Sequence, residues 1–291
     1  MIVPVPPAAL APAPAPSLEA AFVLARAAAA PAANPAAVLG GSGSVDGKLA
    51  AIDALHSRIP TQPKAKQAAA LDALAAAAAS DGQPPEVRAK ALTYLGYAMP
   101  QVGDDASRSR GLKVLLAALK SPVYRVYALR GLGPACHELP AADEAAFQGA
   151  LLDLLDGPVS GEERQTALVA LFSFVSTRDD LAKREPALVA QLDARLLGPL
   201  DAAPALFVSD SRYTPGAREL AIATVWSSAR HRQALGDPAA SIRVGAFLAL
   251  LSAVERDPQV LGWIATYRAA APPAPFRAST TKRAPDGPDE P

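Results

Sequence analysis

The sequence contains few of the residues on which disulfides, metal sites and thiol chemistry depend. Among its 291 residues there are three histidines and a single cysteine, Cys136, so no disulfide can form within the chain. No two of these residues have the i, i+4 spacing of a metal-ligand pair on a helix. Cys136 and His137 are adjacent, and adjacent helical side chains point about 100° apart, so they cannot exchange a proton directly. We therefore expect no catalytic residues, no metal site and no cofactor.

Aromatic residues and net charge are also scarce. Aromatic residues make up 5% of the chain and hydrophobic residues 51%, which predicts a core built mainly from alanine and leucine. Lysine plus arginine and aspartate plus glutamate both number 28, so no net charge attracts nucleic acid or an anionic membrane. No uninterrupted apolar run reaches the length of about 18 residues that indicates a membrane span. We expect no membrane span, and nucleic acid is an unfavoured partner.

A repeated helical pattern is what the sequence does contain. In its clearest copy, Arg125 is followed by small or apolar residues three, four and seven positions later, which places them on one face of a helix. The pattern recurs, in a degenerate form at Lys66 and fully at four more arginines: Arg88, Arg164, Arg218 and Arg243. The early copies are about 38 residues apart, which is typical of two-helix repeat units. The later intervals are about 54 and about 25 residues, which predicts an insertion.

Helices are predicted over 46–58, 63–79, 84–99, 106–120, 122–137, 141–156, 160–176, 186–198, 215–234, 239–255 and 257–269. Proline lies at or near many of these starts, where its missing amide hydrogen costs little. We expect residues 201–213 to form the insertion, with Pro204, Ser209, Asp210 and Ser211 interrupting any helix. No segment alternates in the manner of a strand, so no sheet is predicted.

The pattern resembles the HEAT-like repeats, particularly the short type of phycobilin-lyase-like proteins. In that family a V-R-x-x-A-x-x-x-L helix precedes a partner helix of the A-L-x-x-L-L kind. Residues 86–96 followed by 112–119, and residues 124–133 followed by 149–155, match these two helices, and the resemblance spans residues 60–256. It implies an all-α fold, a right-handed α-solenoid of about five helix pairs. The family's shared positions are structural, so the resemblance implies no catalytic residue.

The two ends of the chain differ from this region. Residues 1–44 are predicted to be a disordered Ala/Pro/Gly-rich tether, with a short helix near 17–30 and a flexible linker at 34–44. Residues 45–270 are predicted to form the solenoid, and the Pro-rich residues 271–291 a disordered tail. We expect a cytoplasmic location, with a periplasmic or envelope location as the alternative if a signal has been removed.

Charged residues are assigned structural roles. The repeated arginines are expected to pair with acidic or carbonyl groups of neighbouring units rather than to line a phosphate groove. Four acidic pairs precede helices and are assigned to capping, with general acid/base work as the alternative: Asp104-Asp105, Asp143-Glu144, Glu162-Glu163 and Asp179-Asp180. Cys136 is expected to be a buried thiol.

Tyrosines suggest a binding site. Tyr94, Tyr97 and Tyr127, with Lys90 and Arg130 nearby, are predicted to form part of a partner-binding face, because aromatic residues and arginine are common at the energetic centres of interfaces. Tyr124 is expected to be core, and simple filling of space by all four tyrosines is the alternative. A second candidate near the C-terminal end comprises Trp226, Trp263 and Tyr267, for which a core and end-cap role is favoured.

Three function classes are open at this point. The first is a non-enzymatic scaffold or adaptor that binds a protein or peptide on the solenoid face. The second is nucleic-acid binding of the kind seen in HEAT-like alkylpurine DNA glycosylases, which requires a continuous basic stripe. The third is a factor for the assembly or regulation of an enzyme. The sequence determines neither the identity of the partner nor the oligomeric state.

Overall fold

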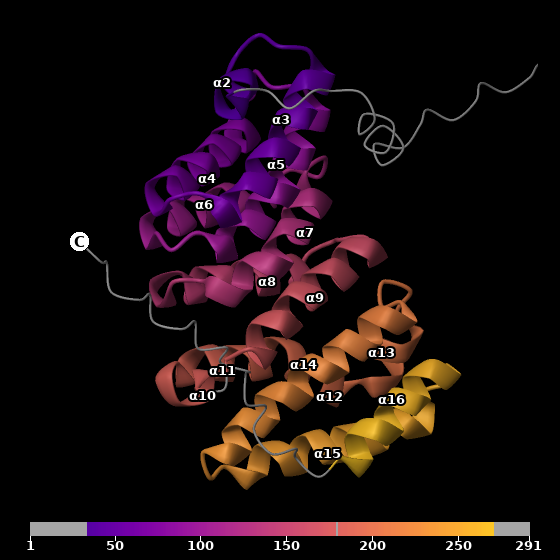
Figure 1. Ribbon diagram of the computed structural model, residues 1–291. Coiled ribbons are helices and arrows are strands. Elements are labelled where there is room, and N and C mark those ends of the chain that lie inside the picture. The colour runs from indigo at the N-terminus through magenta and orange to yellow at the C-terminus, as the bar shows by residue number, and fades with distance from the viewer. Residues whose placement is uncertain (1–33, 179, 271–291) are drawn as a thin grey trace, which may run out of the picture.

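Figure 1 shows the computed structural model of the chain, which describes residues 34–178 and 180–270. These residues form an all-α structure and contain no strand, so the predicted fold class is confirmed at this level. Within them, no helix combines the length and apolar composition that crossing a bilayer requires. The predicted helix at 17–30 and the terminal segments 1–33 and 271–291 lie outside the described residues.

The first part of the chain contains α2 (Pro35–Gly40), α3 (Val45–Arg58), α4 (Lys64–Ala79), α5 (Pro85–Ala98), α6 (Asp105–Ala118), α7 (Arg125–Ala135), α8 (Glu144–Asp156) and α9 (Gly161–Ser176). The second contains α10 (Leu181–Arg184), α11 (Pro186–Leu192), α12 (Gly198–Ala202), α13 (Pro204–Ser209), α14 (Pro215–Ala234), α15 (Pro238–Val254) and α16 (Pro258–Ala269). Short 3₁₀ turns lie at Ile59–Thr61, Met99–Gln101, Cys136–Glu138 and Ala141–Asp143, and a π-helical turn lies at Asp193–Leu197.

Local sequence explains where many helices begin. Ser160 and Glu163 form a reciprocal capping box at the start of α9. Asp104 and Thr214 accept backbone hydrogen bonds at the starts of α6 and α14. Proline occupies the first turn of several helices, as the sequence predicts: Pro186, Pro215, Pro238 and Pro258. The α5 helix starts at Pro85, and the predicted Pro84 lies at its N-cap.

The helices pack in two rows (Figure 1). In the first row α5 contacts α7, α7 contacts α9 and α9 contacts α14; in the second row α4 contacts α6, α6 contacts α8 and α8 contacts α11. Leucine and alanine predominate among the buried residues, and one core extends from α2 to α16. Each helix therefore buries its apolar face mainly against neighbours in its own row and the adjacent row.

Two glycines allow the closest helix approach in the first row. A Cβ atom built on Gly96 of α5 would lie 1.9 Å from the carbonyl oxygen of Gly131 in α7. A Cβ atom on Gly131 would lie 2.6 Å from the carbonyl oxygen of Leu92. The two backbones therefore touch at a point where no other residue type fits.

The structure corrects three predictions about secondary structure. The predicted linker 34–44 contains α2, which Asn34 caps and in which Leu39 is buried. The predicted insertion 201–213 contains α13, because Pro204 starts a helix there rather than interrupting one, and Phe207 is buried against Tyr213. The predicted helix 186–198 is continued by a π-helical turn and α12. In the first two cases tertiary burial stabilises a helix too short to form alone.

Candidate interaction face

Four of the five repeated arginines make the same kind of contact with the segment that precedes their helix. Each donates a hydrogen bond to a backbone carbonyl there: Arg88 to Ala78 at 3.3 Å, Arg125 to Leu119 at 2.9 Å, Arg164 to Leu155 at 2.9 Å and Arg218 to Tyr213 at 2.8 Å. Arg243 instead pairs with Asp201 at 3.0 Å. The predicted structural role is confirmed. Three of these carbonyls lie at a helix C-terminus, where a cation satisfies an unpaired acceptor, and that of Tyr213 lies in the turn before α14.

Three of the predicted interface residues lie on α5. Lys90 is buried, and its Nζ donates to Asp53 Oδ2 at 2.7 Å and to the Leu49 carbonyl at 3.1 Å. Tyr94 is half-buried, and its ring lies edge-on to the imidazole of His56 with 5.1 Å between the centroids. Tyr97 is 50% exposed and also lies edge-on to His56, at 6.4 Å. The histidine is a member of this group that the sequence did not indicate.

The other two predicted residues lie on α7. Tyr127 is buried, and the guanidinium of Arg130 lies 5.9 Å from its ring centroid. Arg130 is partly exposed and forms an ion pair with Glu162 of α9 at 3.1 Å. Lys90 and Tyr127 both come two residues after a motif arginine, so the two groups occupy the same side of neighbouring helices in the first row.

We call this surface the tyrosine face and define it by its accessible members, His56, Tyr94, Tyr97, Arg130 and Glu162. It combines aromatic rings with one cation and one anion, which suits a mixed apolar and polar partner surface. Burial lowers the pKa of His56 below its usual value, and Asp53 partly opposes this shift. The imidazole is therefore neutral near pH 7 and acts as an aromatic surface.

Tyr124 lies just before α7 rather than inside it. Its ring is half-buried against the core, and the guanidinium of Arg88 lies 4.4 Å from its centroid. This contact packs the start of one repeated motif against the start of the next. The expected core role of Tyr124 is therefore seen only in part.

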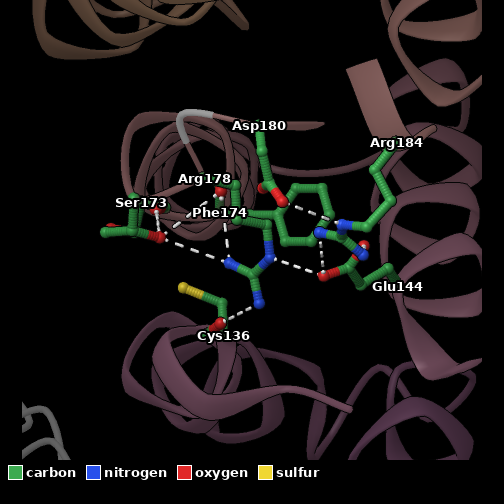
Figure 2. Close-up of polar contacts among 8 residues, drawn as sticks. Cys136, Glu144, Ser173, Phe174, Arg178, Asp180 and Arg184 are labelled. Carbon is green, nitrogen blue, oxygen red and sulfur yellow. Dashed lines mark hydrogen bonds and ion pairs between the residues drawn. The ribbon is translucent and has the colours of Figure 1, made fainter. Parts of the chain in front are cut away.

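A buried polar cluster lies around Glu144 at the start of α8 (Figure 2). Arg178 Nε donates to Glu144 Oε1 at 2.8 Å, and Arg184 Nη1 donates to Glu144 Oε2 at 2.9 Å. Arg178 also donates to the carbonyl of Cys136 and lies 4.4 Å from the ring centroid of Phe174. These contacts connect the end of α7 and the start of α8 to Arg178, between α9 and α10, and to Arg184 in α10.

Glu144 therefore has a different role from the predicted one. Its side chain makes buried ion pairs and does not cap α8, whereas Asp104 and Glu163 do act at helix starts. Two arginines on a single buried carboxylate satisfy the hydrogen-bonding capacity that burial would otherwise leave unmet. Sequence spacing could not reveal this cluster, because Glu144 lies 34 positions before Arg178 and 40 before Arg184.

Cys136 lies beside this cluster as a buried free thiol. Burial raises the pKa of Cys136 to about 12, although the nearby Arg178 acts in the opposite direction. The thiolate is the reactive form of cysteine, so Cys136 is protonated and inert at neutral pH. This agrees with the expected buried thiol.

The second candidate group lies at the C-terminal end. The rings of Trp226 on α14 and Tyr267 on α16 have centroids 5.1 Å apart, and Trp263 stacks on Tyr267 at 6.0 Å. Trp226 and Tyr267 are half-buried, and Trp263 is 37% exposed. These ring contacts hold α16 against α14, and the side of the group that carries Trp263 remains accessible.

Comparisons with known proteins do not assign the chain to a family. No protein-family model matches the sequence, and searches of curated proteins and of solved structures found no match. Within the described residues, no three side chains of His, Cys, Asp or Glu gather in a way that could hold a metal ion. Among the described residues, large exposed aromatic side chains occur at the tyrosine face, with Tyr97, and at the C-terminal aromatic group, with Trp263.

Proposed function

We propose that the two rows of helices form a right-handed α-solenoid of HEAT-like repeats. Supporting this, equivalent arginines of successive motifs make equivalent hydrogen bonds to the segment before them. Contacts also connect each helix chiefly to its neighbours in its own row and in the adjacent row. Such a stack has no single compact centre and offers a long lateral surface to partners.

The function that this architecture supports best is that of a non-enzymatic scaffold or adaptor that binds a protein or peptide on the tyrosine face. The observation on which the proposal depends is Tyr97, a large aromatic side chain that is 50% exposed beside His56 and Tyr94. Exposed aromatic side chains held by neighbouring rings lose little conformational freedom on binding, and they dominate many interface energies.

The test is quantitative affinity capture from the source cell, read by mass spectrometry. Tyr97→Ala and Arg130→Ala should each reduce the recovery of the same partner at least about tenfold, as expected for an energetic centre. The matched control is Leu206→Ala on α13, because Leu206 is 70% exposed and lies away from the tyrosine face. Circular dichroism should show unchanged helix content for all three variants.

Recovery that is equal for wild type and both tyrosine-face variants would remove the proposal. Nucleic-acid binding, the alternative class, would appear as a gel shift of the intact protein that weakens steeply with salt. The ion pairs of the two groups, Lys90 with Asp53 and Arg130 with Glu162, give the face no net positive stripe, which disfavours that alternative.

A further inference from the structure

A groove with a volume of about 330 Å³ lies between α14, α15 and α16, apart from the tyrosine face. Its floor and walls include Trp226, Val244, Leu248 and Tyr267. The Trp226 and Tyr267 rings are tilted by 48° relative to each other. Arg230 lies over the Trp226 ring, 5.6 Å from its centroid. The groove thus offers two aromatic surfaces with aliphatic side chains between them.

The chain leaves the described structure at the edge of this groove. Ala270, the residue after α16, forms part of the groove wall. The next six residues of the sequence, 271–276, are Ala-Pro-Pro-Ala-Pro-Phe. Proline-rich segments favour the extended polyproline II conformation, which has no internal hydrogen bonds and loses little entropy on docking. Grooves lined by aromatic side chains are the usual receptors for such segments.

We propose that residues 271–276 of the same chain occupy this groove. Tyr267 and Trp226 would pack against the flat faces of the proline rings, and the apolar walls at Val244 and Leu248 would take the apolar side chains of the segment. Occupation of the groove by the chain's own segment covers the aromatic side of α16. The segment then acts as a built-in competitor against any other proline-rich ligand.

The point at which the chain leaves the groove favours this occupant over a separate molecule. The segment follows Ala270 directly, so no linker separates it from the groove, and its effective concentration there is in the millimolar range or above.

The experiment measures binding of a fluorescein-labelled peptide of residues 271–277 by fluorescence anisotropy. The receptors are the full chain and a full-length tail variant that carries Pro272→Ser, Pro273→Ser, Pro275→Ser and Phe276→Ser. The peptide should bind the tail variant at least about tenfold more tightly than the native chain, because the native segment competes for the same groove.

Two glycines supply a groove-blocking variant and its control. Gly245 lines the groove and Gly262 on α16 does not, and a Cβ atom at either position would meet no atom within 4 Å. In the tail-variant background, Gly245→Gln should abolish peptide binding, and Gly262→Gln should leave it unchanged. Both changes remove a helical glycine, so neither is expected to impair folding.

Three results would overturn the proposal. The first is absence of peptide binding to the tail variant. The second is equal affinity for the native chain and the tail variant, which would mean that the tail does not occupy the groove. The third is a concentration-dependent dimer of the native chain in sedimentation that Gly245→Gln disrupts, because the segment would then bind a second copy.

Discussion

The arginine at the start of each repeated motif has a structural role that the sequence predicts and a degree of burial that only the tertiary structure reveals. The spacing of the motif predicts its structural role, and the carbonyl hydrogen bonds confirm it. The degree of burial differs widely, however. Arg164 is buried, donates to the Leu155 carbonyl and lies 4.6 Å from the ring centroid of Tyr213. Arg243 is about half exposed and pairs only with Asp201 among the described contacts.

Replacement of these two arginines should therefore have unequal effects. Arg164→Leu leaves a buried carbonyl without its charged donor, and we expect a loss of about 2 to 3 kcal/mol in the free energy of unfolding. Arg243→Leu removes an exposed ion pair and should cost less than about 1 kcal/mol. Urea unfolding monitored by circular dichroism measures both. Equal losses would show that the carbonyl contact is not the stabilising interaction.

Individual site residues were only partly predictable. Tyr97 and Arg130 are accessible, as an interface requires, whereas Lys90 and Tyr127 are buried by contacts that join different helices. His56 belongs to the same group, yet it lies about forty residues before Tyr97 and carries no motif. Burial and ring contacts depend on how the helices are placed relative to one another, which residue type alone does not specify.

At the scale of helices, the contact between α5 and α7 places the strictest limit on side-chain size. The two backbones meet at Gly96 and Gly131, and there is no space for a side chain on either helix. Gly149 in α8 is also helical, but a Cβ atom added to it would meet no atom within 4 Å. Glycine therefore has a packing role at Gly96 and Gly131 and none at Gly149.

Alanine substitution should separate these roles. Gly96→Ala and Gly131→Ala force the helices apart, and each should lower the free energy of unfolding by about 3 kcal/mol. Gly149→Ala should instead be stabilising, by about 0.5 to 1 kcal/mol, because alanine favours the helix more than glycine does. Thermal unfolding of the three variants is the measurement. A destabilised Gly149→Ala protein, or unaffected Gly96→Ala and Gly131→Ala proteins, would contradict the proposed packing.

The boundaries of long helices follow from local sequence, since caps and first-turn prolines act within one turn. The short helices do not. Sequence favoured irregular structure for α2 and α13, and only burial of Leu39 and Phe207 shows why these segments are helical. Segments of so few residues cannot offset the entropy cost of nucleation without tertiary contacts.

For the whole molecule, the proposed solenoid predicts that the loss of a buried side chain destabilises mainly the neighbouring helices. The effect therefore depends on where the side chain lies in the stack. Phe174 is fully buried in α9, with its ring centroid 5.1 Å from that of Phe147, and α9 has neighbours on both sides. Ile264 is also buried, but it lies in α16, the last described helix. A stack held by neighbour contacts should therefore respond differently to the loss of each side chain.

Hydrogen exchange followed by mass spectrometry tests this difference. Phe174→Ala should cost about 3 to 5 kcal/mol and accelerate exchange in α7, α9 and α14. Ile264→Ala should accelerate exchange in α14, α15 and α16 and leave α4 to α6 unchanged. If Ile264→Ala accelerated exchange equally in α4 to α6, the molecule would behave as one compact unit and the solenoid proposal would fail.

Local sequence was sufficient to establish that the described chain is all-helical, where most of its long helices begin and end, and that its repeated arginines are structural. These features depend on periodicity, capping and first-turn proline, all of which act over a few neighbouring residues. The packing of the helices was needed to establish that α5 and α7 meet at two glycines, that Glu144 joins two arginines and that Trp226 and Tyr267 line a groove. Those contacts join residues tens of positions apart, and their geometry depends on how whole helices pack.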